Sequence, residues 1–131
     1  MVKEIEIEGK IFSGRGEGAM FMELPGVREE IEEKLGFTPY PGTLNLRLPE
    51  GERHKKVLLE KTGGRELSLK SNFYTGIVFE GRLIGRVKCG IVIPQTPDYP
   101  EDHLEVIASV RLRDKFNLED GDPFKVEILM S

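Results

Sequence analysis

The apolar residues of this 131-residue chain come in short runs that are repeatedly interrupted by its 15 glycines and 8 prolines. Near the start, Ile5 and Ile7 alternate with Glu4, Glu6 and Glu8, a spacing typical of a half-buried β-strand. Similar short runs recur along the chain, and only one segment shows a convincing helical spacing. Many short strands with one helix favour a small β-barrel or a β-sandwich.

The expected strands are bounded by turn-forming residues. Gly9 indicates a bulge or bend in the first strand, and Pro94 is expected to end its strand because proline lacks an N–H donor. Residues 80–82 are predicted to form a hairpin turn, and residues 111–118 one or two helical turns. The strands are expected at residues 2–13, 19–24, 43–48, 57–59, 67–69, 74–79, 83–93, 104–110 and 124–129.

Residues 27–35 are predicted to form the main helix. Val27, Ile31 and Leu35 recur at i, i+4 and i+8, so they share one helical face. Glutamates occupy the opposite side, and Gly36 is placed to cap the C-terminal end.

Composition restricts the class of protein. The net charge is −4, which gives no general attraction to nucleic acid. Cys89 is the only cysteine, which excludes an intramolecular disulfide and a cysteine-based zinc site and fits a reducing cytoplasm. The N-terminus does not read as a signal peptide, and no apolar run is long enough to cross a bilayer. A cytoplasmic, globular, single domain over residues 1–131 is therefore expected, without membrane or nucleic-acid partners.

A glycine-rich segment follows the first expected strand. Gly14, Gly16 and Gly18 alternate with other residues, so successive backbone N–H groups can converge on an anion. The segment also fits a loose dinucleotide-binding pattern, but that pattern requires a helix directly afterwards, where a strand is expected here. A hairpin turn without a ligand is the alternative interpretation.

Thr43 and Asn45 lie two residues apart in an expected strand, so both side chains should be on one face. Two neutral oxygens side by side suit a hard cation such as Mg²⁺. The alternative is a structural role, because strands often contain threonine and an asparagine can satisfy backbone groups near a turn.

Charged and aromatic residues supply further candidates. Glu105 enters an apolar strand, where a carboxylate needs a partner, so it is a site candidate; a solvated rim is the alternative. His103 is a candidate base or ligand. The guanidinium groups of Arg15, Arg111 and Arg113 suit phosphate, although surface charge explains them equally well. Four aromatic side chains could stack on a planar ligand or pack the core: Tyr40, Phe73, Tyr74 and Tyr99.

Three segments together resemble the archaeal CTP-dependent riboflavin kinases. They are Gly14-x-Gly16-Glu17-Gly18, then Leu35-Gly36-Phe37-x-Pro39-Tyr40-x-Gly42-Thr43-Leu44-Asn45-Leu46, and Arg111-Leu112-Arg113-Asp114-x-Phe116-Asn117-Leu118-x-Asp120-Gly121-Asp122. The resemblance covers essentially the whole chain. It implies a six-stranded Greek-key β-barrel of the cradle-loop type, which transfers the γ-phosphoryl group of CTP to the ribityl 5′-hydroxyl of riboflavin.

The resemblance also implies roles for individual residues. Thr43 and Asn45 would coordinate Mg²⁺, and Thr96 and Glu105 would contact the flavin, with Glu105 as a hypothetical general base. The loop around Thr96 departs from the family pattern, which leaves its register open. The nucleotide would be held by Gly14, Arg15, Gly16, Glu17, Gly18 and Ala19, and by Val110, Arg111, Leu112 and Arg113.

Two other functions stay open at this point. One is a nucleotide- or flavin-binding protein without turnover. The other is a DNA-binding module, because residues 112–128 also resemble the swapped-hairpin units of small regulators. The negative net charge argues against DNA binding. The expected enzyme would act on small molecules as a monomer.

Overall fold

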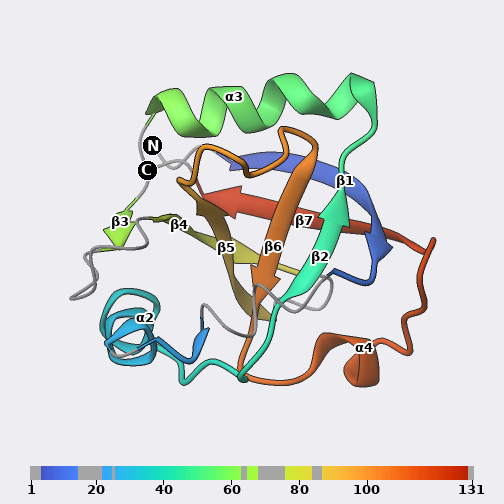
Figure 1. The fold of residues 1–131 in the computed structure, drawn as a ribbon. Helices are drawn as coiled ribbons and strands as arrows, with labels where there is room; N and C mark the ends of the chain where they lie inside the picture. The colour runs from blue at the N-terminus through green and yellow to red at the C-terminus, as the bar shows by residue number, and fades with distance from the viewer. Residues whose placement is uncertain are drawn as a thin grey trace.

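The computed structural model describes residues 4–14, 22–24, 26–62, 65–67, 76–83 and 87–129. Strands dominate these ranges, as the sequence pattern predicts (Figure 1). The elements in chain order are β1 (Glu4–Phe12), α2 (Val27–Leu35), β2 (Leu44–Arg47), the 3₁₀ turn η1 (Glu50–Glu52), α3 (Arg53–Thr62), β3 (Arg65–Leu67), β4 (Gly76–Arg82), β5 (Lys88–Pro94), β6 (His103–Ile107), α4 (Leu112–Lys115) and β7 (Pro123–Leu129).

The strands form one antiparallel sheet that closes on itself. Its order is β3-β4-β5-β6-β2-β1-β7, and β4 also pairs with β7. This last pairing joins Gly81 to Ile128 and Arg82 to Glu127. The result is a closed six-stranded barrel, with β3 added at the edge of β4. The predicted six-stranded barrel is thus confirmed.

Alternation along the strands separates the inside of the barrel from the outside. On β2, Leu44 and Leu46 are buried in the central cluster, so Asn45 between them lies on the outer face. On β6, Leu104 and Val106 point inward in the same way. The outer side chains of neighbouring strands therefore lie side by side on the barrel wall.

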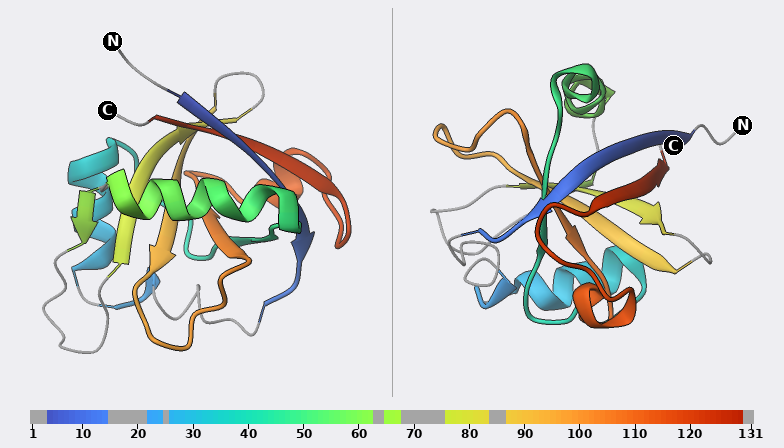
Figure 2. Two further views of the ribbon diagram at one scale, coloured as in Figure 1. Left: turned by 90° about the horizontal axis from the view of Figure 1, so that it is seen from above. Right: turned by 90° about the vertical axis from the view of Figure 1, so that its right-hand side faces the viewer.

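Two helices cover opposite ends of the barrel. Leu59 of α3 and Leu112 of α4 both belong to the central apolar cluster. Figures 1 and 2 show α3 across one end and α4 at the other. The inside of the barrel is therefore a packed core whose ends are capped by apolar side chains.

The helix α2 has the predicted bounds and packs on the outer wall. Its buried residues are Val27, Ile31 and Leu35, and Gly36 caps its end with φ 78°. These three buried residues of α2 form a second apolar cluster with outward-facing residues of β4, β5 and β6. Gly90 permits this packing, because a Cβ there would lie 2.5 Å from the Cδ1 of Leu35.

The strand predicted at residues 57–59 is wrong, because these residues lie in α3. Only Leu59 of the three is buried, while Val57 and Leu58 are 49% and 45% exposed. Three consecutive apolar residues look like a buried strand in the sequence. In the structure, the helical turn brings Lys56 and Leu59 to the same buried side.

The hairpin turn predicted at residues 80–82 is also wrong. These residues lie inside β4, where Gly81 pairs with Cys89. The chain turns later, and the N–H of Leu83 bonds to the carbonyl of Val87 at 2.9 Å. A glycine in a strand resembles a turn signal, although here it allows Glu127 of β7 to come close.

Other boundaries differ by smaller amounts. The first strand continues without a bulge at Gly9, which pairs in register with Phe124 and closely approaches the backbone of β2. Residues 22–24, the described part of the strand predicted at 19–24, are not a strand, and Met22 packs beneath α2 instead. Pro94 ends β5 as predicted.

The packing of α2 generates a stability prediction. Ile31 is fully buried between α2 and the barrel wall, so Ile31→Ala should lower the free energy of unfolding by about 2–5 kcal/mol. Chemical denaturation of the variant measures this loss. Glu33→Ala on the exposed side of the same helix is the control, and equal stabilities would contradict the packing described here.

Candidate active site

A row of outward-facing residues crosses four neighbouring strands of the barrel, β1, β2, β6 and β5. Phe12 pairs with Asn45, Asn45 with Glu105, and Glu105 with Val92. Thr43, two residues before Asn45, lies beside the same row. The face that the sequence predicts for Thr43 and Asn45 therefore exists, and β6 adds a carboxylate to it.

The side chain of Glu105 is almost fully buried, with 5% of its surface exposed. The hydroxyl of Thr43 donates a hydrogen bond to its Oε1 at 2.8 Å. A buried carboxylate is costly unless hydrogen bonds or opposite charges compensate it. Thr43 supplies one such contact, so these two residues fix each other's position on the wall.

The donor set of this row fits a hard cation. The Thr43 hydroxyl donates a hydrogen bond to Glu105, which leaves the lone pairs of the Thr43 oxygen available to a cation. The Asn45 amide adds a second neutral oxygen. Glu105 adds a carboxyl group beside them. Mg²⁺ prefers such oxygen ligands. In the described ranges, no group of three or more His, Cys, Asp or Glu side chains is placed to hold a metal ion.

Gly14 touches this row directly. A Cβ added to Gly14 would lie 2.6 Å from Nδ2 of Asn45 and 3.0 Å from its Cγ. Only glycine therefore fits at this position without moving the amide. The beginning of the glycine-rich segment and the neutral oxygen pair thus lie together, as the sequence interpretation requires. Arg15, Gly16, Glu17, Gly18 and Ala19 lie outside the described residues.

A pocket of about 230 Å³ adjoins Thr43 at the α4 end of the barrel. Residues 40–44 form one side, and the N–H of Tyr40 bonds to the carbonyl of Ala108 at 2.7 Å. The other side includes all four residues predicted for the second half of the nucleotide site: Val110, Arg111, Leu112 and Arg113. Tyr40 and Val110 are 39% and 40% exposed, and Leu112 is buried in the core.

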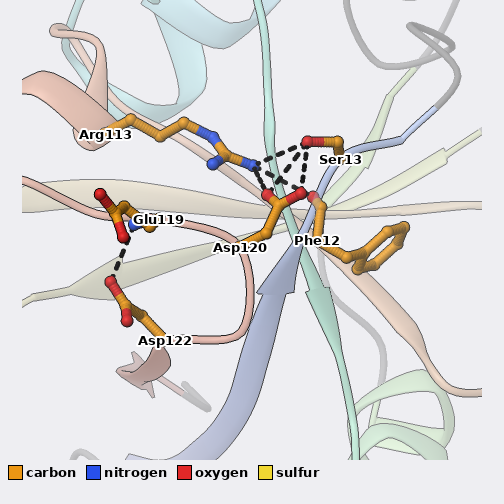
Figure 3. Close-up of polar contacts among 6 residues, drawn as sticks. All are labelled: Phe12, Ser13, Arg113, Glu119, Asp120 and Asp122. Carbon is orange, nitrogen blue, oxygen red and sulfur yellow. Dashed lines mark hydrogen bonds and ion pairs between the residues drawn. The ribbon is translucent and has the colours of Figure 1, made fainter.

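The guanidinium group of Arg113 makes contacts within the protein (Figure 3). Its Nη2 donates to Oδ1 of Asp120 at 2.7 Å, to the carbonyl of Phe12 at 3.3 Å and to Oγ of Ser13 at 3.5 Å. The Ser13 hydroxyl contacts both carboxylate oxygens of Asp120, at 2.8 and 3.0 Å. Arg113 therefore links α4 to the end of β1.

Backbone hydrogen bonds strengthen the same junction. The N–H of Ile11 bonds to the carbonyl of Asp122 at 2.9 Å, and the N–H of Gly121 bonds to the carbonyl of Ile11 at 2.7 Å. The hydrogen bond from Arg113, together with that from Ser13, holds the pKa of the Asp120 carboxyl below its usual range. Asp120 therefore keeps its charge at neutral pH, and the ion pair is lost only as the pH falls through that lowered pKa.

Thr96 lies in a different hollow. This hollow, of about 490 Å³, separates α3 from the loop after β5, and residues on its rim include Thr96, Tyr99 and Lys56. The structure therefore does not bring Thr96 into the pocket that Thr43 lines. It does place Thr96 just after β5, the strand that pairs with β6 at Glu105.

Lys56, which the sequence interpretation passed over, holds this loop. Its ammonium donates to the carbonyls of Pro100 and Glu101 at 3.0 and 3.2 Å and lies 4.9 Å from the centre of the Tyr99 ring. Burial lowers its pKa. The sequence signal for Lys56 is its helical spacing from Leu59, which places both residues on the buried face of α3.

Ser13 and Asp120 are also absent from the predicted site. They are 107 residues apart, and Asp120 is exposed, so neither periodicity nor burial marks them. The available signal was the segment from Arg111 to Asp122, which carries part of the family resemblance.

The contact between Gly14 and Asn45 generates a prediction. Gly14→Ala should displace the Asn45 amide, because a methyl group cannot fit 2.6 Å from its Nδ2. The side-chain amide resonances of Asn45 should shift in a nitrogen–proton correlation spectrum, while the melting temperature changes little. Gly51→Ala is the control, since its Cβ would meet nothing within 4 Å. Unmoved Asn45 resonances would contradict the contact.

Comparison with known proteins identifies the family. A family model named for CTP-dependent riboflavin kinases, with the description "Domain of unknown function DUF120", matches residues 11–128. In the described ranges, no helix is long and apolar enough to cross a membrane.

Several archaeal proteins named riboflavin kinase are similar over nearly the whole chain. The protein of Archaeoglobus fulgidus is 42% identical over 136 residues, which covers 96% of this chain and 55% of the relative. That of Pyrobaculum aerophilum is 42% identical, covering 98% and 63%, and that of Methanosarcina barkeri is 37% identical, covering 95% and 56%. The chain spans somewhat more than half the length of these relatives. By this similarity and the family match, it belongs to the archaeal CTP-dependent riboflavin kinase family.

Proposed function

We propose that this chain transfers the γ-phosphoryl group of CTP to the 5′-hydroxyl of riboflavin, giving FMN and CDP, with Mg²⁺. Family membership supports the reaction class. The observation that carries the proposal is the arrangement on the barrel wall, where Gly14, Thr43, Asn45 and Glu105 meet beside the pocket formed by residues 40–44 and 106–113.

The pocket is suited to the nucleotide. Its walls combine the exposed ring of Tyr40 with the side chain of Arg111, whose guanidinium group is ion-paired with Asp114. A flat base can stack on such a ring. Phosphates extending from the pocket toward Thr43 would reach the oxygen pair and then the end of β1 at Gly14.

Phosphoryl transfer requires positioning and charge neutralisation more than covalent chemistry from the protein. Mg²⁺, when bound, would supply positive charge to the phosphate oxygens. Thr43 and Asn45 are neutral and would leave that charge undiminished. The close fit of Gly14 against Asn45 brings the start of the glycine-rich segment to this point, and backbone N–H groups of that segment would stabilise the developing negative charge.

We assign to Glu105 the role of accepting the proton of the riboflavin hydroxyl. It lies on the shared face, and the hydrogen bond from Thr43 fixes its orientation. The attacking alcohol is a weak acid, so a carboxylate would accept the proton late in the reaction. Glu105 would thereby lie between the bound riboflavin and the Mg²⁺ held by Thr43 and Asn45. Thr96 remains the proposed second flavin contact.

The free and buried thiol of Cys89 fits the reducing cytoplasm that this proposal expects. Burial raises its pKa to about 12, so the thiol is not a nucleophile at neutral pH. We therefore give Cys89 no chemical role and assign the proton transfer to Glu105.

The direct test is conversion of riboflavin to FMN. The chain is mixed with riboflavin, Mg²⁺ and either CTP or ATP, and the flavins are separated by chromatography. FMN formed with CTP and at most slowly with ATP is the expected result. FMN formed equally well with both nucleotides would contradict the proposed donor, and no FMN with either would contradict the reaction.

Glu105→Gln should lower kcat by about 100-fold, because the amide cannot accept the proton. The amide retains the size of the side chain and can still accept the hydrogen bond from Thr43. Riboflavin affinity, measured from quenching of flavin fluorescence, separates binding from turnover. Glu127→Gln, an exposed position on β7, is the control. Unchanged turnover with unchanged flavin affinity would remove Glu105 from the proton-transfer step.

A further inference from the structure

We propose that Asp120 and Ser13 are positioning residues for nucleotide binding. Together with Arg113 they form a junction, here called the β1 clamp, that holds the end of β1 beside Asn45 and ties it to the α4 side of the pocket. This inference rests on the proposed function, because it assumes that the pocket binds a nucleotide. Ser13 and Asp120 themselves lie outside the predicted nucleotide site.

The contacts of the β1 clamp converge on one carboxylate. Asp120 accepts hydrogen bonds from Arg113 of α4 and from Ser13 after β1, which are 100 residues apart in the chain. Arg113 also reaches the carbonyl of Phe12. Charge-assisted hydrogen bonds of this kind are short and directional. The clamp therefore joins three separate segments at one point (Figure 3).

The β1 clamp differs from the ordinary surface ion pairs of the chain. Arg111 contacts Asp114 three residues along the chain, and the two side chains are 49% and 72% exposed. Arg113 is 24% exposed, and it contacts Asp120, which is 55% exposed and lies in another segment. An exposed pair between near neighbours in sequence contributes little to stability. The contact of Arg113 is branched, because the same guanidinium nitrogen also reaches Phe12 and Ser13, so it restrains the end of β1.

The clamp acts next to the residues expected to bind the phosphates and Mg²⁺. Ser13 lies between Phe12, the register partner of Asn45, and Gly14, which touches the Asn45 amide. Loss of the Asp120 carboxylate would remove the shortest contacts of both Ser13 and Arg113, and would leave only the longer ones from Arg113 to Phe12 and Ser13. Gly14 could then move away from Asn45, while the loop holding Thr96, on the α3 side of the barrel, would keep its contacts with Lys56.

The geometry therefore separates the two substrates. Damage to the clamp should weaken nucleotide binding and leave flavin binding unchanged. It should also remove the ion pair of Arg113, whose guanidinium group would then be held only by Phe12 and Ser13. A residue with only a general structural role would instead affect both substrates and the melting temperature.

The experiment compares Asp120→Ala, Ser13→Ala and the double variant with the unmodified chain. Titration calorimetry measures the affinity for CDP with Mg²⁺, and flavin fluorescence measures the affinity for riboflavin. We expect about threefold to tenfold weaker CDP binding for Asp120→Ala, the size expected for a partly exposed, charge-assisted contact. The double variant should be no worse than Asp120→Ala, because the two residues act as one unit.

The matched control is Glu6→Gln, at the other end of β1 from the clamp, which removes an exposed ion pair to Lys125 of β7. Its CDP affinity should equal that of the unmodified chain. CDP affinity unchanged in both clamp variants would overturn the positioning role. Equal weakening of CDP and riboflavin binding would overturn it too, because that result indicates general damage.

A second measurement keeps this inference separate from the proposed function. Amide hydrogen exchange of residues 11–14 in the ligand-free chain should be faster in Asp120→Ala than in the unmodified chain. If the unmodified chain binds no CDP, the proposed function fails, and the exchange rates still decide whether the clamp restrains β1. Unchanged exchange would overturn the clamp even if CDP binds.

Discussion

The staggered pairing of β1 determines where the candidate site forms. This strand pairs with β7 from Glu4 to Lys10 and with β2 from Lys10 to Phe12, so Lys10 alone is paired on both sides. Such a stagger accompanies the closure of a small barrel. The last residues of β1 therefore leave β7 and run beside Asn45, with the 119–122 turn taking the free edge. The strand itself delivers Gly14 to the site.

The oxygen-bearing side chains on the outer wall of the barrel differ in chemical type. Thr43 and Asn45 are neutral, whereas Glu105 is a carboxylate that is almost entirely removed from water. Removing Thr43 would leave this buried carboxyl group without one of its hydrogen bonds, at a cost larger than the usual worth of such a bond. The threonine therefore supports the carboxylate whether or not a cation is present, which links the stability of the fold to the order of the site.

Local patterns in the sequence are enough to predict much of the fold. The helix 27–35 is predictable because Val27, Ile31 and Leu35 recur on one face, and the flanking glycine caps it. The segment around Leu58 is misassigned from sequence because its helix buries a narrow side, so an apolar triplet outweighs the helical spacing. Gly81 misleads in a similar way, since glycine serves both turns and close strand contacts.

The same reasoning explains how much of the site the sequence can predict. Period-two spacing is sufficient to place Thr43 and Asn45 on one face of a strand. Their contact with Glu105 depends on the pairing of β2 with β6, across 62 residues of sequence. The clamp depends on a still longer separation, between Ser13 and Asp120. Such contacts leave no local periodicity, so resemblance to a family is the only sequence signal for them.

The two helices that cover the barrel ends, α3 and α4, also affect which substitutions the protein can tolerate. Leu59 and Leu112 complete an interior whose side chains point away from the outward-facing row of Asn45 and Glu105. Substitutions in the row of Asn45 can therefore be made without opening a void in the interior. The packed interior can be treated as a constant frame on which the outward-facing side chains are exchanged independently.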